Sequence, residues 1–545
     1  MSTAATPLPA ETEALVIGAG FAGLYMLHRL RGLSIAAHGV EAGGDVGGTW
    51  YWNRYPGARC DVESMQYSYG FDPGLQQEWR WSERFASQGE ILDYARHVAE
   101  RLDLRRSITF NTRVAAARFD AASGRWHVET EGGGRVAARF LILATGCLSR
   151  AKLPEIPGIG DFAGPIHHTG EWPHEAVDFT GRRVGVIGTG SSAIQAVPAI
   201  AEQAAQVVVF QRTPNFSVPS RNAPMDPDYE AGWKRDYANR RAAARAMRTG
   251  VLLEVNPRSA LEVDEATREA EYERRWQAGS TAFLAAFSDL LISQQANDTA
   301  ADFVRRKIRE LVRDPAVAEM LLPDNHPIGT KRLCVDTRYY ETFNLPHVRL
   351  VDLRRTPIET VTATGIRTSA EEIALDDLVC ATGFDAMTGT ILAMEIEGPG
   401  GLRLRDIWAE GPRAYLGLMV AGFPNLFMIT GPGSPSVLSN MIVSIEQHVD
   451  FIAGLLAEMG GRGAARVEAT AEAQEGWVAH VNAIAAGTLY PRANSWYMGA
   501  NVAGKPQVFM PYVGGVGRFR MKCDAIAQAG YTGFAMDGAQ AAAAE

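Results

Sequence analysis

Two glycine-rich turns, each placed directly after a short apolar run, limit what this chain of 545 residues can fold into. In the segment EALVIGAGFAGLYMLHRL, Gly18, Gly20 and Gly23 follow the spacing G-x-G-x-x-G. In RRVGVIGTGSSAIQ, Gly188 and Gly190 repeat it, with alanine in the third place. Such a turn lets a pyrophosphate approach the N-terminus of the next helix, where free amide groups and the positive end of the helix dipole lie. Two of them predict an α/β protein with two Rossmann-like dinucleotide-binding domains.

The two units differ in the charge that follows their second strand. Glu41 lies 23 residues after Gly18, at a place where a carboxylate binds ribose hydroxyls. Arg212, followed by Thr213, lies 24 residues after Gly188, and an arginine at this place suits a 2'-phosphate. The sequence thus distinguishes FAD or NAD at the first site from NADP at the second. Because a single redox nucleotide has nothing to exchange electrons with, we expect one FAD and one NADPH.

The order of the two units predicts that one domain is inserted in the other. Apolar runs that end in Ala-Thr-Gly, at 140–146 and 378–385, are expected to close the two nucleotide domains and to carry the chain between them. The predicted order is an FAD-binding domain, first part, 1–148; an NADP-binding domain, first part, 149–222; a helical insertion, 223–327; the NADP-binding domain, second part, 328–385; and the FAD-binding domain, second part, 386–545.

Helical spacing identifies the insertion. Val304, Ile308 and Leu311 lie on one helical face after the cap-like NDT at 297–299. The basic stretch NRRAAARAMR, residues 239–248, is expected to be a solvated helix face.

Charge and cysteine usage argue against several classes of function. The net charge of -9 does not suit a nucleic-acid partner or an anionic membrane surface. Five cysteines are scattered without a C-x-x-C pair, which argues against a disulfide framework, a thiol-redox pair and a four-cysteine zinc site. The apolar runs at 14–27 and 414–431 are interrupted by glycine, proline or asparagine, so neither a leader nor a membrane span is predicted. We expect a cytoplasmic enzyme acting on small molecules, as a monomer or weak dimer.

The stretch FAGPIHHTGEWP, residues 162–173, has neither the alternation of a strand nor the apolar stripe of a helix. Its adjacent His167 and His168 suggest a metal site, but zinc needs three or four ligands, and no nearby Cys or His pattern supplies them. No metal is therefore predicted. The stretch comes just before the second nucleotide unit, where a clamp between the two domains is expected.

The same stretch resembles the fingerprint F-x-G-x-x-x-H-x-x-x-W-P of type I Baeyer-Villiger monooxygenases. It matches at Phe162, Gly164, His168, Trp172 and Pro173. GGTWYWNRYPGARCD at 47–61 is similar to a second signature of that family, and GTKR at 329–332 and SWYMGANVAGK at 495–505 are similar to its catalytic and mobile-loop segments. The segment GPGSPSVLSNM at 431–441 is closest in pattern to phenylacetone and steroid monooxygenases.

This resemblance implies a three-stage reaction. NADPH reduces FAD, O2 adds at the flavin C4a to give a peroxide, and the peroxide attacks a ketone carbonyl, so that one oxygen is inserted beside the carbonyl and an ester or lactone forms. Because negative charge develops on the way, the site needs a cation that cannot act as a proton donor, and arginine meets this demand. The resemblance assigns this role to Arg332 and the balancing carboxylate to Asp61.

The resemblance also implies cofactor and coupling roles. Lys331 joins Arg212 and Thr213 at the 2'-phosphate, Trp496 belongs to a mobile loop near 490–508 that folds over the nicotinamide, and His168 couples NADPH binding to domain movement. The predicted FAD-binding residues are Gly18, Ala19, Gly20, Phe21, Gly23, Glu41, Gly48, Thr49, Trp50, Asp61, Tyr67, Val114 and Met441. The predicted NADP-binding residues are Gly188, Thr189, Gly190, Ser191, Ser192, Gln195, Arg212, Thr213, Lys331, Arg332 and Trp496. The predicted substrate pocket contains Ser436, Val437 and Leu438.

Three alternatives stay open at this point. A related flavin monooxygenase that oxidises nitrogen or sulfur would use the same two nucleotides, although Trp172 and the pair of Arg332 and Asp61 argue against it. An NADPH-dependent disulfide reductase would need a C-x-x-C pair beside the flavin, which the sequence lacks. A redox-sensing binding protein on a degenerate scaffold would not be expected to keep both fingerprints.

Overall fold

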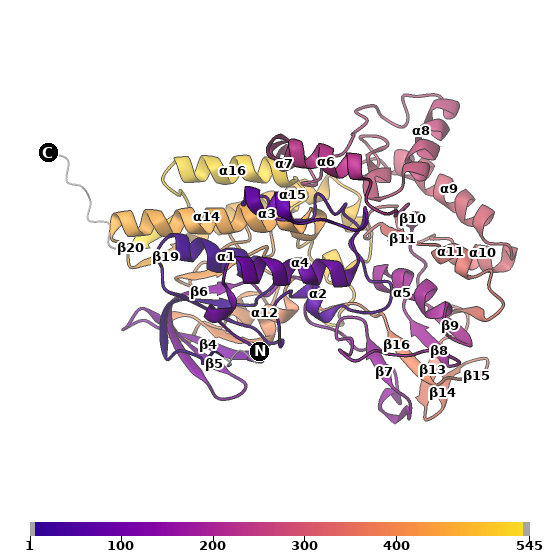
Figure 1. Ribbon diagram of the computed structural model, residues 1–545, viewed down its shortest axis with the longest axis horizontal. Coiled ribbons are helices and arrows are strands. Elements are labelled where there is room, and N and C mark those ends of the chain that lie inside the picture. The colour runs from indigo at the N-terminus through magenta and orange to yellow at the C-terminus, as the bar shows by residue number, and fades with distance from the viewer. Residues whose placement is uncertain (1–5, 538–545) are drawn as a thin grey trace.

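The computed structural model describes residues 6–537. Figure 1 shows two sheets side by side, with a group of helices beside the second sheet and long helices across the first. Both sheets are built mainly from parallel strands, and each has a glycine-rich turn after one of its central strands. The predicted fold class, α/β with two Rossmann-like domains, is confirmed.

The first sheet has eight strands, in the order β17-β4-β5-β6-β1-β2-β3, with β18 also paired with β6. β1 is flanked by β2 and β6, both parallel to it, whereas β5 is antiparallel to β4 and β6. The strands are β1 (Glu11–Ile17), β2 (Ala37–Val40), β3 (Ile108–Thr109), β4 (Val114–Asp120), β5 (Arg125–Thr130), β6 (Arg135–Leu143), β17 (Glu395–Glu397) and β18 (Leu426–Met428).

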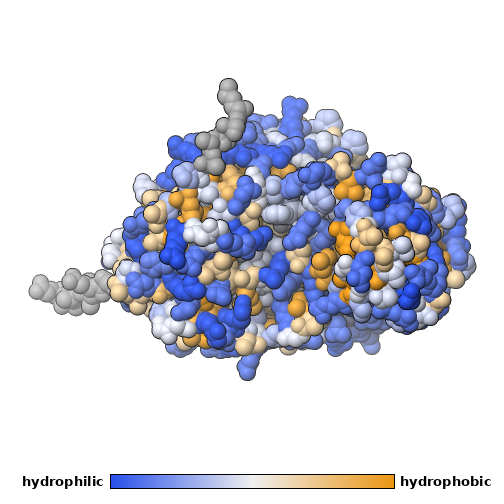
Figure 2. Space-filling model, turned by 90° about the horizontal axis from the view of Figure 1, so that it is seen from below, coloured by the Kyte–Doolittle hydropathy of each residue, from blue (hydrophilic) through white to orange (hydrophobic). Residues whose placement is uncertain are grey.

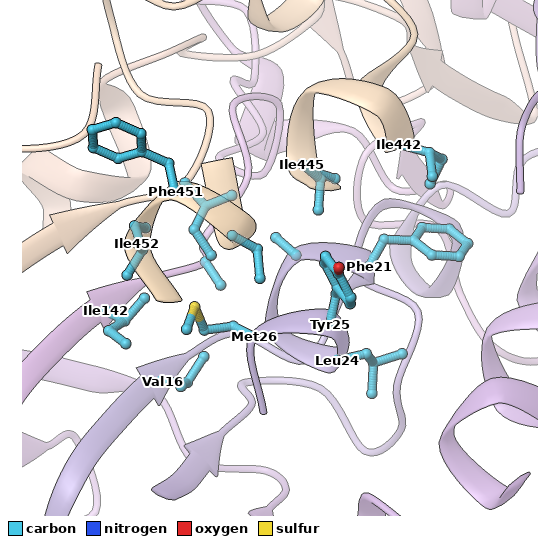
Figure 3. Packing of buried hydrophobic residues seen from close by; sticks show 14 of the residues in the cluster. Val16, Phe21, Leu24, Tyr25, Met26, Ile142, Ile442, Ile445, Phe451 and Ile452 are labelled. Carbon is cyan, nitrogen blue, oxygen red and sulfur yellow. The ribbon is translucent and has the colours of Figure 1, made fainter. Parts of the chain in front are cut away.

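The core of the first domain joins segments from both ends of the chain. One face of the first helix, with Leu24, Leu27 and Leu30, is buried. Figure 3 shows side chains of α1 packed between Val16 of β1 and the long helix α14, which contributes Ile445 and Phe451 among others. The helices of this domain are α1 (Phe21–Gly32), α2 (Thr49–Trp52), α3 (Pro73–Glu78), α4 (Gln88–Arg101), α12 (Gly389–Ala393), α13 (Leu404–Ile407), α14 (Met441–Arg462), α15 (Ala471–Ala486) and α16 (Val516–Gln528). Two strands that are far apart in the sequence, β19 (Arg466–Ala469) and β20 (Phe534–Asp537), form an antiparallel pair beside α14.

The second sheet has five strands, all parallel, in the order β12-β9-β8-β16-β7. Its near-continuous valine and isoleucine runs are typical of strands buried on both faces. The strands are β7 (Ile166–His168), β8 (Arg183–Ile187), β9 (Gln206–Gln211), β12 (Val348–Asp352) and β16 (Asp377–Cys380), and the helices are α5 (Ser191–Ala201) and α11 (Tyr339–Thr342). Smaller sheets pair β10 (Ser217–Pro219) with β11 (Cys334–Asp336), and β13 (Ile358–Thr362) with β14 (Gly365–Thr368) and β15 (Glu372–Ala374).

Two short stretches, residues 150–152 and 383–385, connect the domains, and we call them the crossing segments. They run antiparallel to each other: the amide of Lys152 donates to the carbonyl of Gly383 (3.2 Å), and the amide of Asp385 donates to the carbonyl of Arg150 (3.0 Å). After the second crossing segment the chain returns to the first sheet through β17 and β18. The exact domain boundaries stay a prediction.

Five α-helices follow β10, and two expectations about them are wrong. They are α6 (Pro227–Arg235), α7 (Tyr237–Ala246), α8 (Glu265–Ala278), α9 (Gln294–Leu311) and α10 (Pro315–Leu321). NDT does not cap α9, because Ser293 does; Asn297 lies inside the helix, where its buried amide donates to the carbonyls of Leu290 and Ile328. The stretch 239–248 is not a solvated face either, since Arg241 is buried against the first domain.

The surface is mixed in polarity. Figure 2 shows hydrophilic residues over most of one face, with hydrophobic residues scattered among them. Among residues 6–537, no helix has both the length and the apolar character needed to cross a membrane.

Candidate active site

The first glycine-rich turn has the geometry that a dinucleotide requires. Gly18 has φ 107°, and a Cβ atom there would lie 2.5 Å from the carbonyl oxygen of Ala144. A Cβ at Gly23 would lie 1.9 Å from the oxygen of Gly18, so neither place accepts a side chain. Helix α1 has no side-chain cap at its N-terminus. Its first amide groups are therefore available to an anion.

Glu41 is buried at the end of β2, as the predicted ribose contact requires. Its carboxylate accepts the amide hydrogens of Ala19 and Gly43, both at 2.7 Å. Burial raises the pKa of Glu41, and the two amide groups oppose that rise. Each carboxylate oxygen retains a lone pair for a further donor, such as a ribose hydroxyl.

The second turn repeats this geometry. Gly188 has φ 116°, and a Cβ atom there would lie 2.4 Å from the carbonyl oxygen of Ala381. Helix α5 also lacks a side-chain cap, and no atom lies within 4 Å of the place a Cβ would take at Gly190. The space in front of α5 is thus open for phosphate groups.

Two cations face the end of β9. Arg212 and Lys331 both line the cavity beside the second turn, and burial, followed by the charge of Arg212, lowers the pKa of Lys331. Neither forms a salt bridge with a carboxylate within residues 6–537. Two neighbouring cations without a protein anion suit a doubly charged phosphate ester.

The segment 47–61 joins the two nucleotide sites. The Tyr55 hydroxyl donates to Oε1 of Gln195 on α5 (2.8 Å), and Nε2 of Gln195 donates to the carbonyl of Arg59 (3.1 Å). Gly57 packs directly against the backbone carbonyl of Gln195. Gln195, predicted as an NADP contact, therefore also fixes the second domain against the first.

Arg332 and Asp61 meet between the domains, as predicted. Nε and Nη2 of Arg332 donate to Oδ2 of Asp61 at 3.0 and 2.6 Å, and Nη1 donates to the carbonyl of Val437 at 2.8 Å. The Asp61 carboxylate raises the pKa of Arg332, which outweighs the opposing effect of burial. Because a guanidinium has five N–H donors and these contacts use three, two remain for the nearby Tyr497 hydroxyl and for a substrate. Arg332 is thus a permanent cation in a fixed orientation.

Three buried residues near this pair were not predicted. The Tyr497 hydroxyl is close enough to Arg332 for the two groups to affect each other's pKa, and burial raises that of Tyr497. Cys60 and Cys147 line the same space, and burial raises the pKa of both thiols, to about 11 for Cys147. Burial therefore favours the neutral form of both thiols. Adjacency to Asp61 and Trp496 in sequence was the only signal for Cys60 and Tyr497.

The fingerprint forms a clamp beside the site. His168 ends β7; its Nδ1 accepts the Gly170 amide hydrogen (2.9 Å), and its Nε2 lies 3.4 Å from the Thr382 hydroxyl, next to the second crossing segment. Burial lowers the pKa of His168. The amide of Trp172 donates to the carbonyl of Trp52 at the end of α2 (3.3 Å). Nε2 of His167 lies 3.2 Å from Oδ1 of Asp377, and within residues 6–537 no three His, Cys, Asp or Glu side chains gather as a metal site would require.

A cavity of about 1620 Å³ connects both glycine-rich turns with Arg332. Of the predicted FAD residues, Ala19 and Gly23 do not line it; they shape the turn behind it. All the predicted NADP residues line it, whereas none of the five fingerprint residues does. In the predicted substrate pocket only Val437 lines the cavity. Ser436 is buried with its hydroxyl directed at the sulfur of Met387, and Leu438 packs in the same apolar cluster.

Comparison with known proteins accounts for this arrangement. A family model described as pyridine nucleotide-disulphide oxidoreductase matches residues 15–257. A Baeyer-Villiger monooxygenase of Pseudooceanicola batsensis is 42% identical over 534 residues, which are 97% of each chain. The chain belongs to the Baeyer-Villiger monooxygenase family.

Solved structures of other monooxygenases have the same fold. An oxidized steroid monooxygenase bound to NADP is 52% identical, with a TM-score of 0.93 over 97% of this chain and 100% of that one. The complex of OTEMO with FAD and NADP is 40% identical, with a TM-score of 0.93 over 96% and 99% of the two chains. A phenazine N-monooxygenase of Lysobacter antibioticus is also 41% identical over 96% of both chains. Overall similarity therefore does not by itself separate a ketone substrate from a nitrogen heterocycle.

Proposed function

We propose that this Baeyer-Villiger monooxygenase uses FAD, NADPH and O2 to insert one oxygen atom beside a ketone carbonyl, which gives an ester or lactone. The observation that carries the proposal is the Arg332 guanidinium, held by Asp61 and the Val437 carbonyl at a cavity shared by both nucleotide sites. The names of the relatives support it, because they include a Baeyer-Villiger monooxygenase and steroid and cyclohexanone monooxygenases.

The residues at the first turn fit FAD. The uncapped α1 offers amide groups to the pyrophosphate, and Glu41 offers its carboxylate to the ribose. Gly48 approaches Gly20 so closely that a Cβ would lie 2.9 Å from the Gly20 Cα, which brings the start of α2 to the same anion site. When bound and reduced, FAD would supply the two electrons that activate O2, one atom of which is transferred to the substrate while the other leaves as water.

The residues at the second turn fit NADPH. Thr189, Gly190 and Ser191 present the start of α5 to the phosphates, and Arg212 with Lys331 would bind the 2'-phosphate. Trp496 lines the cavity from the 490–508 loop and would cover the nicotinamide. Together these groups orient the nicotinamide toward the flavin and keep water away.

Arg332 provides the charge that oxygen transfer needs. Negative charge that develops on the ketone oxygen is stabilised by the free N–H donors of the guanidinium, while Asp61 keeps the side chain from swinging away. Arginine keeps its proton in proteins, and Asp61 raises the pKa of Arg332 further. The Arg332 guanidinium therefore does not donate a proton to the reacting groups.

The remaining assignments are part of the same proposal. His168 and Trp172 would couple nucleotide binding to domain movement through their contacts with the crossing region and with α2. We place the enzyme in the cytoplasm, as a monomer or weak dimer, without nucleic-acid or membrane partners.

The test uses purified enzyme with FAD, NADPH and air, and a panel of cyclic, aryl and steroidal ketones. NADPH loss, hydrogen peroxide and product mass are followed together. We expect a product one oxygen atom heavier than its ketone, formed nearly one for one with NADPH. NADPH loss that yields only peroxide with every ketone would contradict the proposal.

Nitrogen oxidation is a second candidate, because the phenazine N-monooxygenase, at 41% identity, is about as similar as the cyclohexanone 1,2-monooxygenase of Acinetobacter, at 39%. Adding aromatic nitrogen heterocycles and sulfides to the panel separates the two. An N-oxide formed faster than any ester would favour this second function.

A further inference from the structure

Lys505, in the 490–508 loop, is a largely buried lysine. The proposed reaction gives it no role. Its Nζ donates to Oδ1 of Asp385 (2.6 Å) and to the carbonyl of Ala386 (2.7 Å), and its side chain is 10% exposed. Lysine is rarely buried without a partner, because its charge loses hydration. Its position is therefore specified by the second crossing segment and the residue after it.

The same loop contacts both crossing segments. Nδ2 of Asn501 donates to the carbonyl of Phe384 (2.7 Å), and the carbonyl of Asn501 accepts from Nζ of Lys152 (3.3 Å). Asn501 and Lys505 thus bind Phe384 and Asp385 of the second crossing segment, Ala386 directly after it, and one residue of the first crossing segment. The loop can take this position only while the crossing segments are paired as described.

The alkyl chain of Lys505 connects these contacts to the aromatic residues of the loop. Trp496 and Tyr497 lie in a short 3-10 helix, Trp496–Met498, that ends at Gly499 with φ 75°. Lys505 packs on that end, since a Cβ at Gly499 would lie 3.2 Å from its Cγ and Cδ. Moving Lys505 would therefore move the support of the helix that faces Arg332.

We propose that Lys505 is a positioning residue: by pairing with Asp385 it holds the 490–508 loop against the second crossing segment and so keeps Tyr497 near Arg332 and Trp496 in the wall of the same cavity. The ion pair of Lys505 and Asp385 thereby links the second crossing segment, which connects the domains, to the 490–508 loop, which lines the active-site cavity. An ion pair can separate at low cost when the loop moves away, because both charged groups then regain hydration. An apolar contact at the same place would expose hydrophobic surface to water.

The experiment compares Lys505→Gln with Lys505→Arg, and with Lys522→Gln on the exposed surface of α16 as the matched control. The peroxide formed per NADPH is measured with a ketone present, alongside the rate of flavin reduction by NADPH. We expect Lys505→Gln to raise the peroxide share about tenfold, the scale of losing a hydrogen bond to a charged group, with flavin reduction unchanged. Lys505→Arg and Lys522→Gln should behave like wild type.

A second readout does not depend on the ketone reaction, on which the first one rests. Binding of NADP+ should protect the 490–508 loop of the wild-type holoenzyme from a protease, and this protection should be lost in Lys505→Gln and in Asp385→Asn. Failure of wild type to make an ester would count against the proposed function alone. Wild-type coupling and protection in both variants, or equal losses in Lys522→Gln, would overturn the role of Lys505.

Discussion

At the scale of single residues, the site depends on charges that are paired so as to stay fixed. Arg332 is bound by one carboxylate and one carbonyl, and its raised pKa follows from that pairing. A lysine would not reproduce the arrangement, because an ammonium lacks the planar fork that contacts Asp61 and Val437 together.

Arg332→Ala should therefore abolish most ester formation and leave NADPH oxidation in place. Ester formation is expected to fall at least about 100-fold, the scale of losing an oxyanion donor, while NADPH oxidation with peroxide release continues. Arg135→Ala, with a side chain that is 80% exposed, is the control. Product analysis with NADPH and peroxide balances checks this, and an ester yield near wild type would exclude the assigned role.

Arg212→Ala should weaken the preference for NADPH over NADH. Removing a charge-assisted contact to the 2'-phosphate is expected to lower the ratio of the two kcat/KM values about tenfold or more, with NADH itself little affected. Steady-state kinetics with both nucleotides measures the ratio. An unchanged ratio would mean that the 2'-phosphate binds elsewhere.

At this scale, the sequence predicted the site residues that lie within a recognisable motif. Arg332 and Asp61 lie in GTKR and in the 47–61 signature, and the structure brings them together. Tyr497 and the pair of Lys505 and Asp385 were not identified, because a contact across 120 residues leaves no local pattern. Ser436 was misplaced for a related reason: a segment shows which residues are near a pocket, but the backbone decides which side chain turns away from it.

At the scale of elements, strands and glycine turns were predictable and one helix face was not. The short apolar runs before each turn became β1 and β8, since their pattern is local. The basic sequence of α7 predicts a solvated helix face. In the structure, however, Arg241 donates to the carbonyls of Gln66 and Met65 and to the Ser68 hydroxyl. Those acceptors, two backbone carbonyls and one hydroxyl, belong to a distant loop, which composition does not reveal.

Arg241→Met should accordingly loosen the docking of α7 on the first domain. The substitution removes a donor from the Met65 carbonyl and the Ser68 hydroxyl, while the Gln66 carbonyl keeps the Asn440 amide, and the loss is expected to cost about 3 kcal/mol of unfolding free energy. Arg235→Met, exposed on α6, is the matched control. Thermal unfolding of both variants under identical conditions checks the difference, and equal midpoints would contradict it.

At the scale of the whole molecule, the two domains communicate through a few polar contacts. Tyr55 and Gln195 connect the segment beside the FAD site to the helix at the NADP site. The family and fold class inferred from the sequence are confirmed by relatives that match almost the full chain. The contacts between the domains were beyond sequence reasoning, because they depend on how two independently recognisable units are oriented.

Tyr55→Phe should weaken this communication without removing either cofactor site. NADP+ at about 100 times its Kd stabilises the domain that binds it by about 2.7 kcal/mol. In wild type we expect NADP+ to raise the temperature at which FAD is released, and in Tyr55→Phe to raise it less. Flavin fluorescence during heating measures the release. Tyr415→Phe, whose hydroxyl contacts Thr532 within the first domain, should retain the full shift.

The insertion of one sheet within the other also sets the order in which the parts can form during synthesis. β6 ends at Leu143, but its partner β18 begins only at Leu426, after every strand of the second sheet. Because domains fold as units while the chain leaves the ribosome, the guest domain is complete before its host. Until the last third of the chain has emerged, the nascent protein exposes the side of β6 and the face of α1 that α14 will cover.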